Sequence, residues 1–142
     1  MKLLKAILCV LLVPFGIIPN CDGAVVVGAE RRTSGNQYKV TAYCPCKKCC
    51  GKNAKGLTKS EYKIQYSDKL CAADYSVPFG TMIEIPCYGT VPVLDRGGKI
   101  KGKKLDVLFY EKSQDPNKTD LEWSHELALQ WGVQYLEVRT EK

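Results

Sequence analysis

Short runs of alternating hydrophobic and polar residues dominate the chain after residue 37. In Tyr38–Tyr43 the hydrophobic side chains occupy one face of an extended chain, and Lys39, Thr41 and Tyr43 occupy the other. Further short strands are expected at about Leu70–Ala73, Thr81–Ile85, Thr90–Leu94, Lys104–Tyr110 and Gln134–Arg139. Glycine and proline residues separate these strands, and regular short strands with such turn signals predict a mainly β domain, a small barrel or a sandwich.

A helix is predicted near the C-terminus, with Ser124 as its N-cap, Glu126–Trp131 as its body and Gly132 as the residue that ends it. The polar segment Glu111–Thr119 is expected to be a connection. The segment Cys44–Lys69 has little periodicity and several turn residues, and it predicts a long loop held together by its cysteines.

The N-terminus has the pattern of a secretory signal. A basic segment at Met1–Lys5 leads into the hydrophobic run Ala6–Pro19, which is short for a helix that spans a bilayer. An uncleaved anchor, or a lipid anchor at Cys21, is the alternative. We therefore expect residues 1–29 to be a leader and residues 30–142 to form one domain that is exported to the periplasm or cell envelope, with outer-membrane association as one option, or secreted.

The composition suits a single globular domain, with 142 residues of which 45% are hydrophobic and 25% charged, and a net charge of +6. Lysines gather at positions 47–63 and 99–104, and such a distribution favours an anionic polymer as partner. No recognisable nucleic-acid module is present, so we expect no nucleic-acid partner. A cell-wall polymer or an anionic lipid fits an exported protein better, although spaced lysines also serve solubility alone.

Six cysteines follow the predicted leader, and four of them form the cluster Cys44-Pro-Cys-Lys-Lys-Cys-Cys50. Export makes disulfides the first hypothesis, with some of this cluster pairing with Cys71 and Cys87. The spacing Cys46-x-x-Cys49 is also that of half a zinc site. No second pair follows, and His125 lies far along the chain, so we favour disulfides and expect neither a metal nor another cofactor. The hypothesis that this Cys-x-x-Cys pair is redox-active has still less support. The disulfide candidates are Cys44, Cys46, Cys49, Cys50, Cys71 and Cys87.

Three aspartates lie in or at the ends of predicted strands. Asp106 interrupts the strand Lys104–Tyr110, on the face opposite Leu105 and Val107. A carboxylate inside a strand is unfavourable and needs an explanation. Asp95 precedes Arg-Gly-Gly, which is good turn chemistry, and Asp74 ends a strand. If their strands are neighbours, crowding would raise one carboxyl pKa, and such a pair is suited to cleaving glycosidic bonds.

These residues carry a resemblance to the three-aspartate ("3D") domain proteins, which are related to the A-type membrane-bound lytic transglycosylases. The resemblance covers about Tyr38–Val138. Its motifs are Val40–Cys46, Gly56–Thr58, Ala72–Asp74, Val77–Pro86, Val93–Gly102, Leu105–Val107 and Ala128–Gly132.

The resemblance implies a six-stranded double-psi β-barrel with one or two short helices that cleaves the bond between N-acetylmuramic acid and N-acetylglucosamine in peptidoglycan. By motif, Asp106 is the general acid and base, while Asp95 and Asp74 shape the charge of the pocket. We assign substrate binding to Thr58, Tyr43, Lys104, Gly97 and Gly98. We expect a monomer that binds glycan strands, with an envelope protein as a partner that supplies the contacts made by the second domain in the A-type enzymes.

The chain departs from the family pattern after Thr58, where Glu61 stands in place of a common glycine, and Cys87 stands where glycine is also common. The alternative function is a non-catalytic, expansin-like barrel that binds carbohydrate. In that hypothesis the basic groove and tyrosines would hold glycans, with the stacking residues being Tyr38, Tyr43, Tyr75, Tyr88 and Tyr110.

Overall fold

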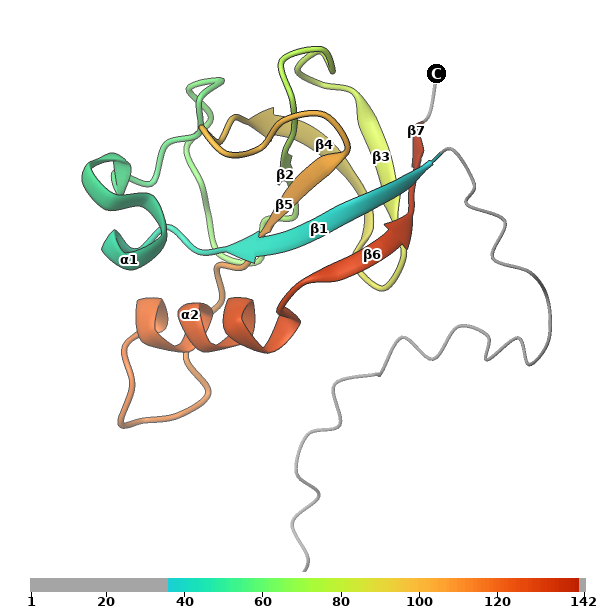
Figure 1. The fold of residues 1–142 in the computed structure, drawn as a ribbon. Helices are drawn as coiled ribbons and strands as arrows, with labels where there is room; N and C mark the ends of the chain where they lie inside the picture. Colours follow the sequence, from blue (N-terminus) through green and yellow to red (C-terminus); the bar gives the residue numbers. More distant parts are fainter. Residues whose placement is uncertain (1–35, 141–142) are drawn as a thin grey trace, which may run out of the picture.

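The structure is a computed structural model that describes residues 36–140, so the expected leader at residues 1–29 lies outside the described residues. The chain forms a mainly β domain in which two α-helices and one 3₁₀ turn lie outside a near-closed barrel (Figure 1). The strands are β1 (Gln37–Tyr43), β2 (Cys71–Ala72), β3 (Met82–Ile85), β4 (Gly89–Asp95), β5 (Lys104–Leu108), β6 (Gln134–Glu137) and β7 (Arg139–Thr140). The helices are α1 (Lys47–Cys50) and α2 (Asp120–Trp131), and the 3₁₀ turn is η1 (Gly51–Asn53).

The strands follow the order β6-β1-β5-β2-β4-β3-β7 around the sheet. Its two outermost strands are consecutive in the chain, with only Val138 between them. β6 pairs with β1, β7 pairs with β3, and the Val138 side chain is 3% exposed. One C-terminal segment therefore joins both edges of the sheet, and the expectation of six strands is wrong because the predicted strand Gln134–Arg139 divides at Val138.

The faces of β1 and β5 agree with the alternation in the sequence. The barrel core contains Val40, Leu105 and Val107, each with no exposed surface. The two strands are parallel, and their register places Thr41 opposite Asp106 on the face that points away from this core. The strand-interior carboxylate is therefore directed away from the hydrophobic core, as the sequence predicted.

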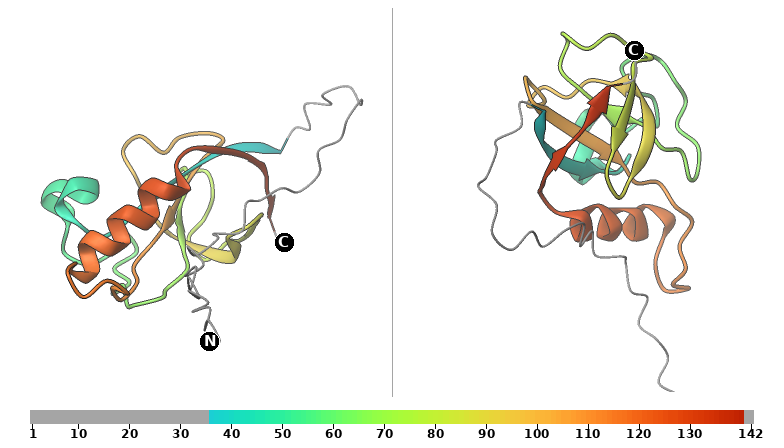
Figure 2. Two further views of the ribbon diagram at one scale, coloured as in Figure 1. Left: turned by 90° about the horizontal axis from the view of Figure 1, so that it is seen from below. Right: turned by 90° about the vertical axis from the view of Figure 1, so that its right-hand side faces the viewer.

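Helix α2 lies along one side of the barrel and is followed directly by β6 (Figure 2). Its N-cap is Thr119, five residues earlier than the Ser124 that the sequence indicated, and Ser124 lies inside the helix. The buried Ser124 hydroxyl bonds to the backbone of Asp120 and Glu111, so this residue fastens the helix to the preceding connection. Gly132 ends the helix with φ of 65°, as predicted. Among residues 36–140, no helix has the length and hydrophobicity needed to cross a membrane.

Candidate functional site

Asp95 and Asp106 open into the same pocket, which has a volume of about 370 Å³. The pocket is lined by Asp95 at the end of β4, by Asp106 in the middle of β5 and by the loop that follows α1. Its lining residues include Tyr43, Asn53, Lys55, Thr58, Lys59, Ala72, Asp95, Arg96, Gly97, Gly98 and Asp106. Two of the three aspartates singled out from the sequence therefore meet at one concave site.

The strand β2 explains how the two carboxyls share this pocket. Ala72 pairs with Asp95 of β4 on one side and with Asp106 of β5 on the other. Neighbouring strands lie about 4.8 Å apart, so the two aspartate backbones are separated by about 10 Å. The residue between them has only a methyl side chain, and it leaves space into which both carboxyls can project.

Asp106 is half-buried, and its Oδ1 atom accepts a hydrogen bond of 2.8 Å from the Thr41 hydroxyl. Burial and the nearby charge of Asp95 raise the pKa of Asp106 from 3.8 to about 6, against the opposing effect of the Thr41 hydrogen bond. A carboxyl with this pKa can hold a proton near neutral pH and can also give it up. These are the properties that a general acid and base requires.

Asp95 accepts three hydrogen bonds. The Tyr43 hydroxyl donates to Oδ2 at 2.8 Å, and the backbone N–H groups of Lys59 and Arg96 donate to Oδ1, each at 2.8 Å. Burial and the Asp95 carboxylate raise the pKa of the Tyr43 phenol far above its ordinary value, so the phenol remains a donor. Asp95 is thus held as an acceptor in the same pocket as Asp106.

Asp74 does not line the pocket, unlike the other two aspartates. Its Oδ1 atom accepts a hydrogen bond of 2.9 Å from the backbone N–H of Ser76, and such hydrogen bonds lower the pKa of its carboxyl. Arg96 donates to the carbonyls of Ala73 and Val77, on either side of Asp74. Asp74 therefore shapes the turn to which the Arg96 side chain is hydrogen-bonded. Arg96 itself lines the pocket.

The structure brings four of the five predicted substrate-binding residues to the pocket, namely Tyr43, Thr58, Gly97 and Gly98. Lys104 is exposed and lies outside it. Gly97 has a steric role, because a Cβ atom there would lie 2.6 Å from Cγ1 of Ile100.

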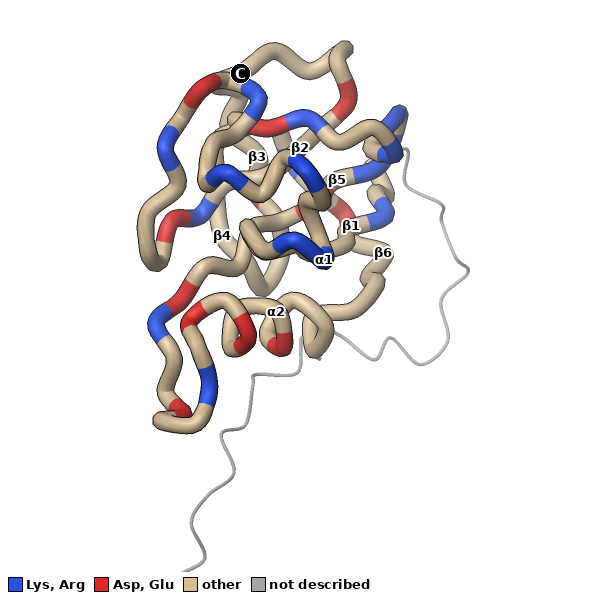
Figure 3. The backbone as a smooth tube through the Cα atoms, turned by 90° about the vertical axis from the view of Figure 1, so that its left-hand side faces the viewer, with Lys and Arg blue, Asp and Glu red and all other residues tan. Residues whose placement is uncertain are grey.

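Sequence reasoning missed Thr41, Lys55, Lys59 and Arg96. Thr41 could have been found by pairing its strand with that of Asp106, whereas the lysine-rich loop carries no signal that singles out individual lysines. Lysine and arginine positions surround α1 and the neighbouring loops, while α2 carries acidic residues (Figure 3).

The expected pairing of the clustered cysteines with Cys71 and Cys87 is not found. Cys44, Cys46, Cys49, Cys50 and Cys71 have free thiols, whereas Cys87 is disulfide-bonded. The physical reason is their location, because Cys71 lies in the barrel core and the four clustered cysteines lie outside it at α1. Instead, the Sγ atoms of Cys44, Cys46 and Cys49 approach Nδ1 of His125, and these four ligand atoms all lie within 4.8 Å of one another.

Comparison with known proteins relates the chain to a cell-wall protein. No protein-family model matches the chain. A stretch of 96 residues is 35% identical to the "putative cell wall shaping protein YabE" of Bacillus subtilis (strain 168), and it covers 65% of this chain and 23% of that protein. The chain thus spans less than a quarter of the length of this relative, and the similarity is to one part of it.

Proposed function

We propose that this protein acts on the cell wall by cleaving O-glycosyl bonds in the glycan strands of peptidoglycan. The observation that carries the proposal is the pocket in which Asp106, with a pKa of about 6, shares space with Asp95. A carboxyl with a raised pKa beside a second carboxyl is the arrangement that cleaves glycosidic bonds. The Bacillus subtilis relative supports the choice of cell-wall glycan as substrate. The resemblance to three-aspartate domain proteins supports the same choice. We extend the double-psi barrel and the lytic chemistry of those proteins to this chain.

In the proposed reaction, protonated Asp106 donates its proton to the bridging oxygen as the bond from that oxygen to the anomeric carbon breaks. Asp95 stabilises the positive charge that develops on the sugar ring. The Asp106 carboxylate then takes the proton from the muramyl C6 hydroxyl while the hydroxyl oxygen bonds to the anomeric carbon. This step closes a 1,6-anhydro ring and restores the acid. If water replaces the C6 hydroxyl, the same residues give hydrolysis.

Basic side chains around the pocket favour an anionic substrate. Lys55, Lys59 and Arg96 line it, and the glycan of the wall carries lactyl and peptide carboxylates. We propose accordingly that the protein works at the cell envelope. Asp74 is a positioning residue in this proposal, since it shapes the loop bound by Arg96 and has no place in the pocket itself.

Most of the tyrosines named for the non-catalytic alternative are not free to stack on a glycan. Glycan binding by stacked tyrosines requires exposed rings, but Tyr43 and Tyr88 are 8% and 5% exposed, and Tyr110 stacks on Tyr66 at 4.4 Å between ring centroids. Tyr75 is 71% exposed and remains available for stacking. It is the one clearly exposed ring among the five tyrosines that this hypothesis names, and one ring is a weak platform compared with the pocket.

The test is digestion of purified peptidoglycan by the protein and by Asp106→Asn, with mass spectrometry of the released fragments. We expect anhydromuramyl ends from the parent and a loss of activity of at least about a hundredfold in Asp106→Asn. Asp74→Asn changes a positioning residue outside the pocket, so its loss of activity should be much smaller than that of Asp106→Asn. Reducing ends would make the enzyme a hydrolase. If the folded parent releases no fragments but still sediments with peptidoglycan, the proposal of cleavage is overturned and the protein is a binding module.

The dependence of activity on pH provides a second test. If Asp106 must be protonated, activity should fall above about pH 6. Thr41→Val removes the hydrogen bond that favours the ionised carboxyl, so the pKa of Asp106 should rise and the falling limb should move to higher pH. The control is Thr90→Val, an exposed position on β4, whose pH profile should match that of the parent. An unchanged profile in Thr41→Val would contradict the assignment of this limb to Asp106.

A further inference from the structure

We propose that Cys44, Cys46, Cys49 and His125 bind one zinc ion in a structural site that fastens the segment 44–50 to α2. This inference goes beyond the proposed function and does not rest on it. The four ligand atoms come from two parts of the chain separated by more than seventy residues, and the tertiary structure gathers them at a single point.

The local sequence prepares three of the ligands. β1 ends at Tyr43, so Cys44 follows at the mouth of the barrel, and Pro45 separates it from Cys46. Cys46 is the N-cap of α1, and the helical turn brings Cys49 over Cys46, because residues three apart share a helix face. The backbone N–H of Cys50 closes this turn on the Cys46 carbonyl at 2.9 Å.

The distances fit a tetrahedral ion. Zn–S bonds of about 2.3 Å and Zn–N bonds of about 2.0 Å place two sulfurs about 3.8 Å apart and a sulfur and a nitrogen about 3.5 Å apart. The Sγ atoms of Cys44 and Cys49 are 3.7 Å apart. His125 Nδ1 lies 3.7, 3.6 and 3.4 Å from the Sγ atoms of Cys44, Cys46 and Cys49, respectively.

The donor set selects the metal. Three thiolates and an imidazole are soft to intermediate ligands that suit Zn²⁺ and not Mg²⁺ or Ca²⁺. An iron–sulfur cluster would hold its ligand atoms farther apart, since several irons and sulfides would separate them. Four protein ligands fill a tetrahedron and leave no position for a reactive water, so the site is structural. Lys47 and Lys48 offset the net negative charge of three thiolates around a divalent ion.

The site would hold one wall of the pocket. α1 is only four residues long and has no side-chain cap, and the chain that follows it supplies Asn53, Lys55 and Thr58 to the pocket lining. The contacts of His125 with the three thiols join segment 44–53 to α2. A shared ion would convert these contacts into bonds and fix the position of the wall.

The test is the metal content of the protein, purified with reductant and zinc and then freed of unbound metal. Mass spectrometry of the elements should give one zinc per chain, and Cys44→Ser and His125→Asn should each lose most of it. Cys50→Ser is the matched control. Its thiol belongs to the same short helix but points to the Cys44 carbonyl, and this variant should keep one zinc. Replacing zinc with Co²⁺ in the parent should give the visible absorption of a tetrahedral thiolate site.

Three results would overturn the proposal. A zinc-free parent with a Cys44–Cys49 disulfide in its peptide map would show that the cluster is oxidised instead. Copper in place of zinc would overturn the metal assignment, and equal zinc loss in Cys50→Ser would overturn the ligand assignment. Asp106→Asn should keep its zinc whether or not the parent cleaves glycan, so the two proposals fail separately.

Discussion

Asp106 is held where its charge is unfavourable, and this has a consequence for stability. Its folded-state pKa of about 6 lies above its ordinary value of 3.8. Folding therefore favours the protonated form, and stability is lost as pH rises from about 4 through about 6. The difference between these two pKa values corresponds to a loss of roughly 3 kcal/mol of folding stability at neutral pH.

Asp106→Asn should accordingly stabilise the protein at neutral pH by up to about 3 kcal/mol and have little effect at pH 4. Urea unfolding at both pH values measures this. Asp74→Asn is the opposite control, because the pKa of Asp74 is lowered and its ionised form supports the fold at neutral pH. A variant Asp106→Asn that is less stable than the parent at pH 7 would contradict the unfavourable charge.

Glu61 has a φ angle of 65°, in the left-handed region that glycine adopts without a Cβ penalty. This conformation accounts for the glycine that is common at this place in the resembled family. Glu61→Gly should therefore raise the free energy of unfolding by about 1 kcal/mol. Glu61→Ala keeps the Cβ atom while removing the charge, so thermal unfolding of this control should show no comparable gain.

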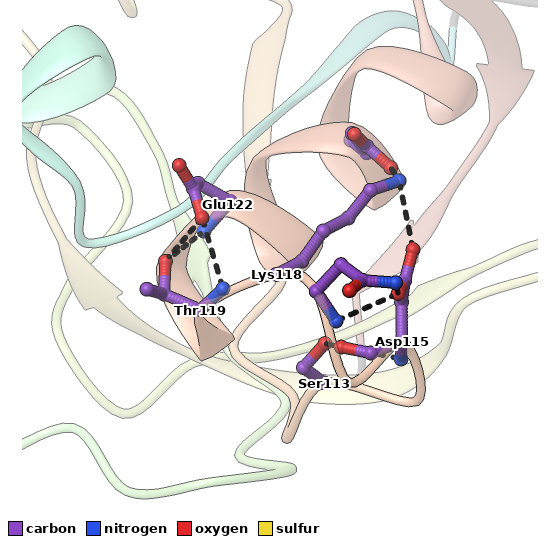
Figure 4. Close-up of polar contacts among 7 residues, drawn as sticks. Ser113, Asp115, Lys118, Thr119 and Glu122 are labelled. Carbon is purple, nitrogen blue, oxygen red and sulfur yellow. Dashed lines mark hydrogen bonds and ion pairs between the residues drawn. The ribbon is translucent and has the colours of Figure 1, made fainter.

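At the scale of elements, α2 depends on its N-terminus. The Thr119 hydroxyl accepts from the backbone N–H of Glu122 at 3.3 Å, and the Glu122 carboxylate accepts from the backbone N–H of Thr119 at 2.9 Å. Figure 4 shows this reciprocal pair beside the contacts of Lys118 with the connection before the helix. The pair is a capping box, and it determines where α2 begins.

Thr119→Ala should lower the free energy of unfolding by about 1 kcal/mol, because the backbone N–H of Glu122 near the helix start loses its acceptor. Chemical denaturation measures the loss. Glu122→Gln is the control, since glutamine also completes a capping box, and its loss should be smaller. Equal stability of Thr119→Ala and the parent would show that the cap contributes nothing.

For the whole molecule, closure of the barrel depends on one buried residue. Val138 is 3% exposed, its backbone N–H donates to the Asn36 carbonyl at 3.2 Å, and it separates the two strands that pair with opposite edges of the sheet. Val138→Ala should cost about 2 kcal/mol through the cavity that it creates. Val133→Ala, at a position 56% exposed, should change stability by less than about 0.5 kcal/mol. Equal effects of the two variants would contradict this role.

The sequence by itself determined the features that depend on local periodicity. Alternation along β1 and β5 predicted that Val40 and Val107 enter the core and that Asp106 faces away from it, because a strand has a period of two residues. The strand positions and the end of α2 at Gly132 were predicted for the same local reasons. The start of α2 was missed although Thr119-x-x-Glu122 is a capping-box pattern, which is itself a local signal in the sequence.

Only the tertiary structure decided which distant residues meet. Asp95 and Asp106 face one pocket because Ala72 pairs with both of their strands, whereas Asp74 turns into a separate loop. His125 joins three cysteines because α2 packs beside the end of β1, and no local pattern encodes that approach. Pairings between segments far apart in sequence arise from burial and strand register over the whole fold, and composition and spacing do not contain this information.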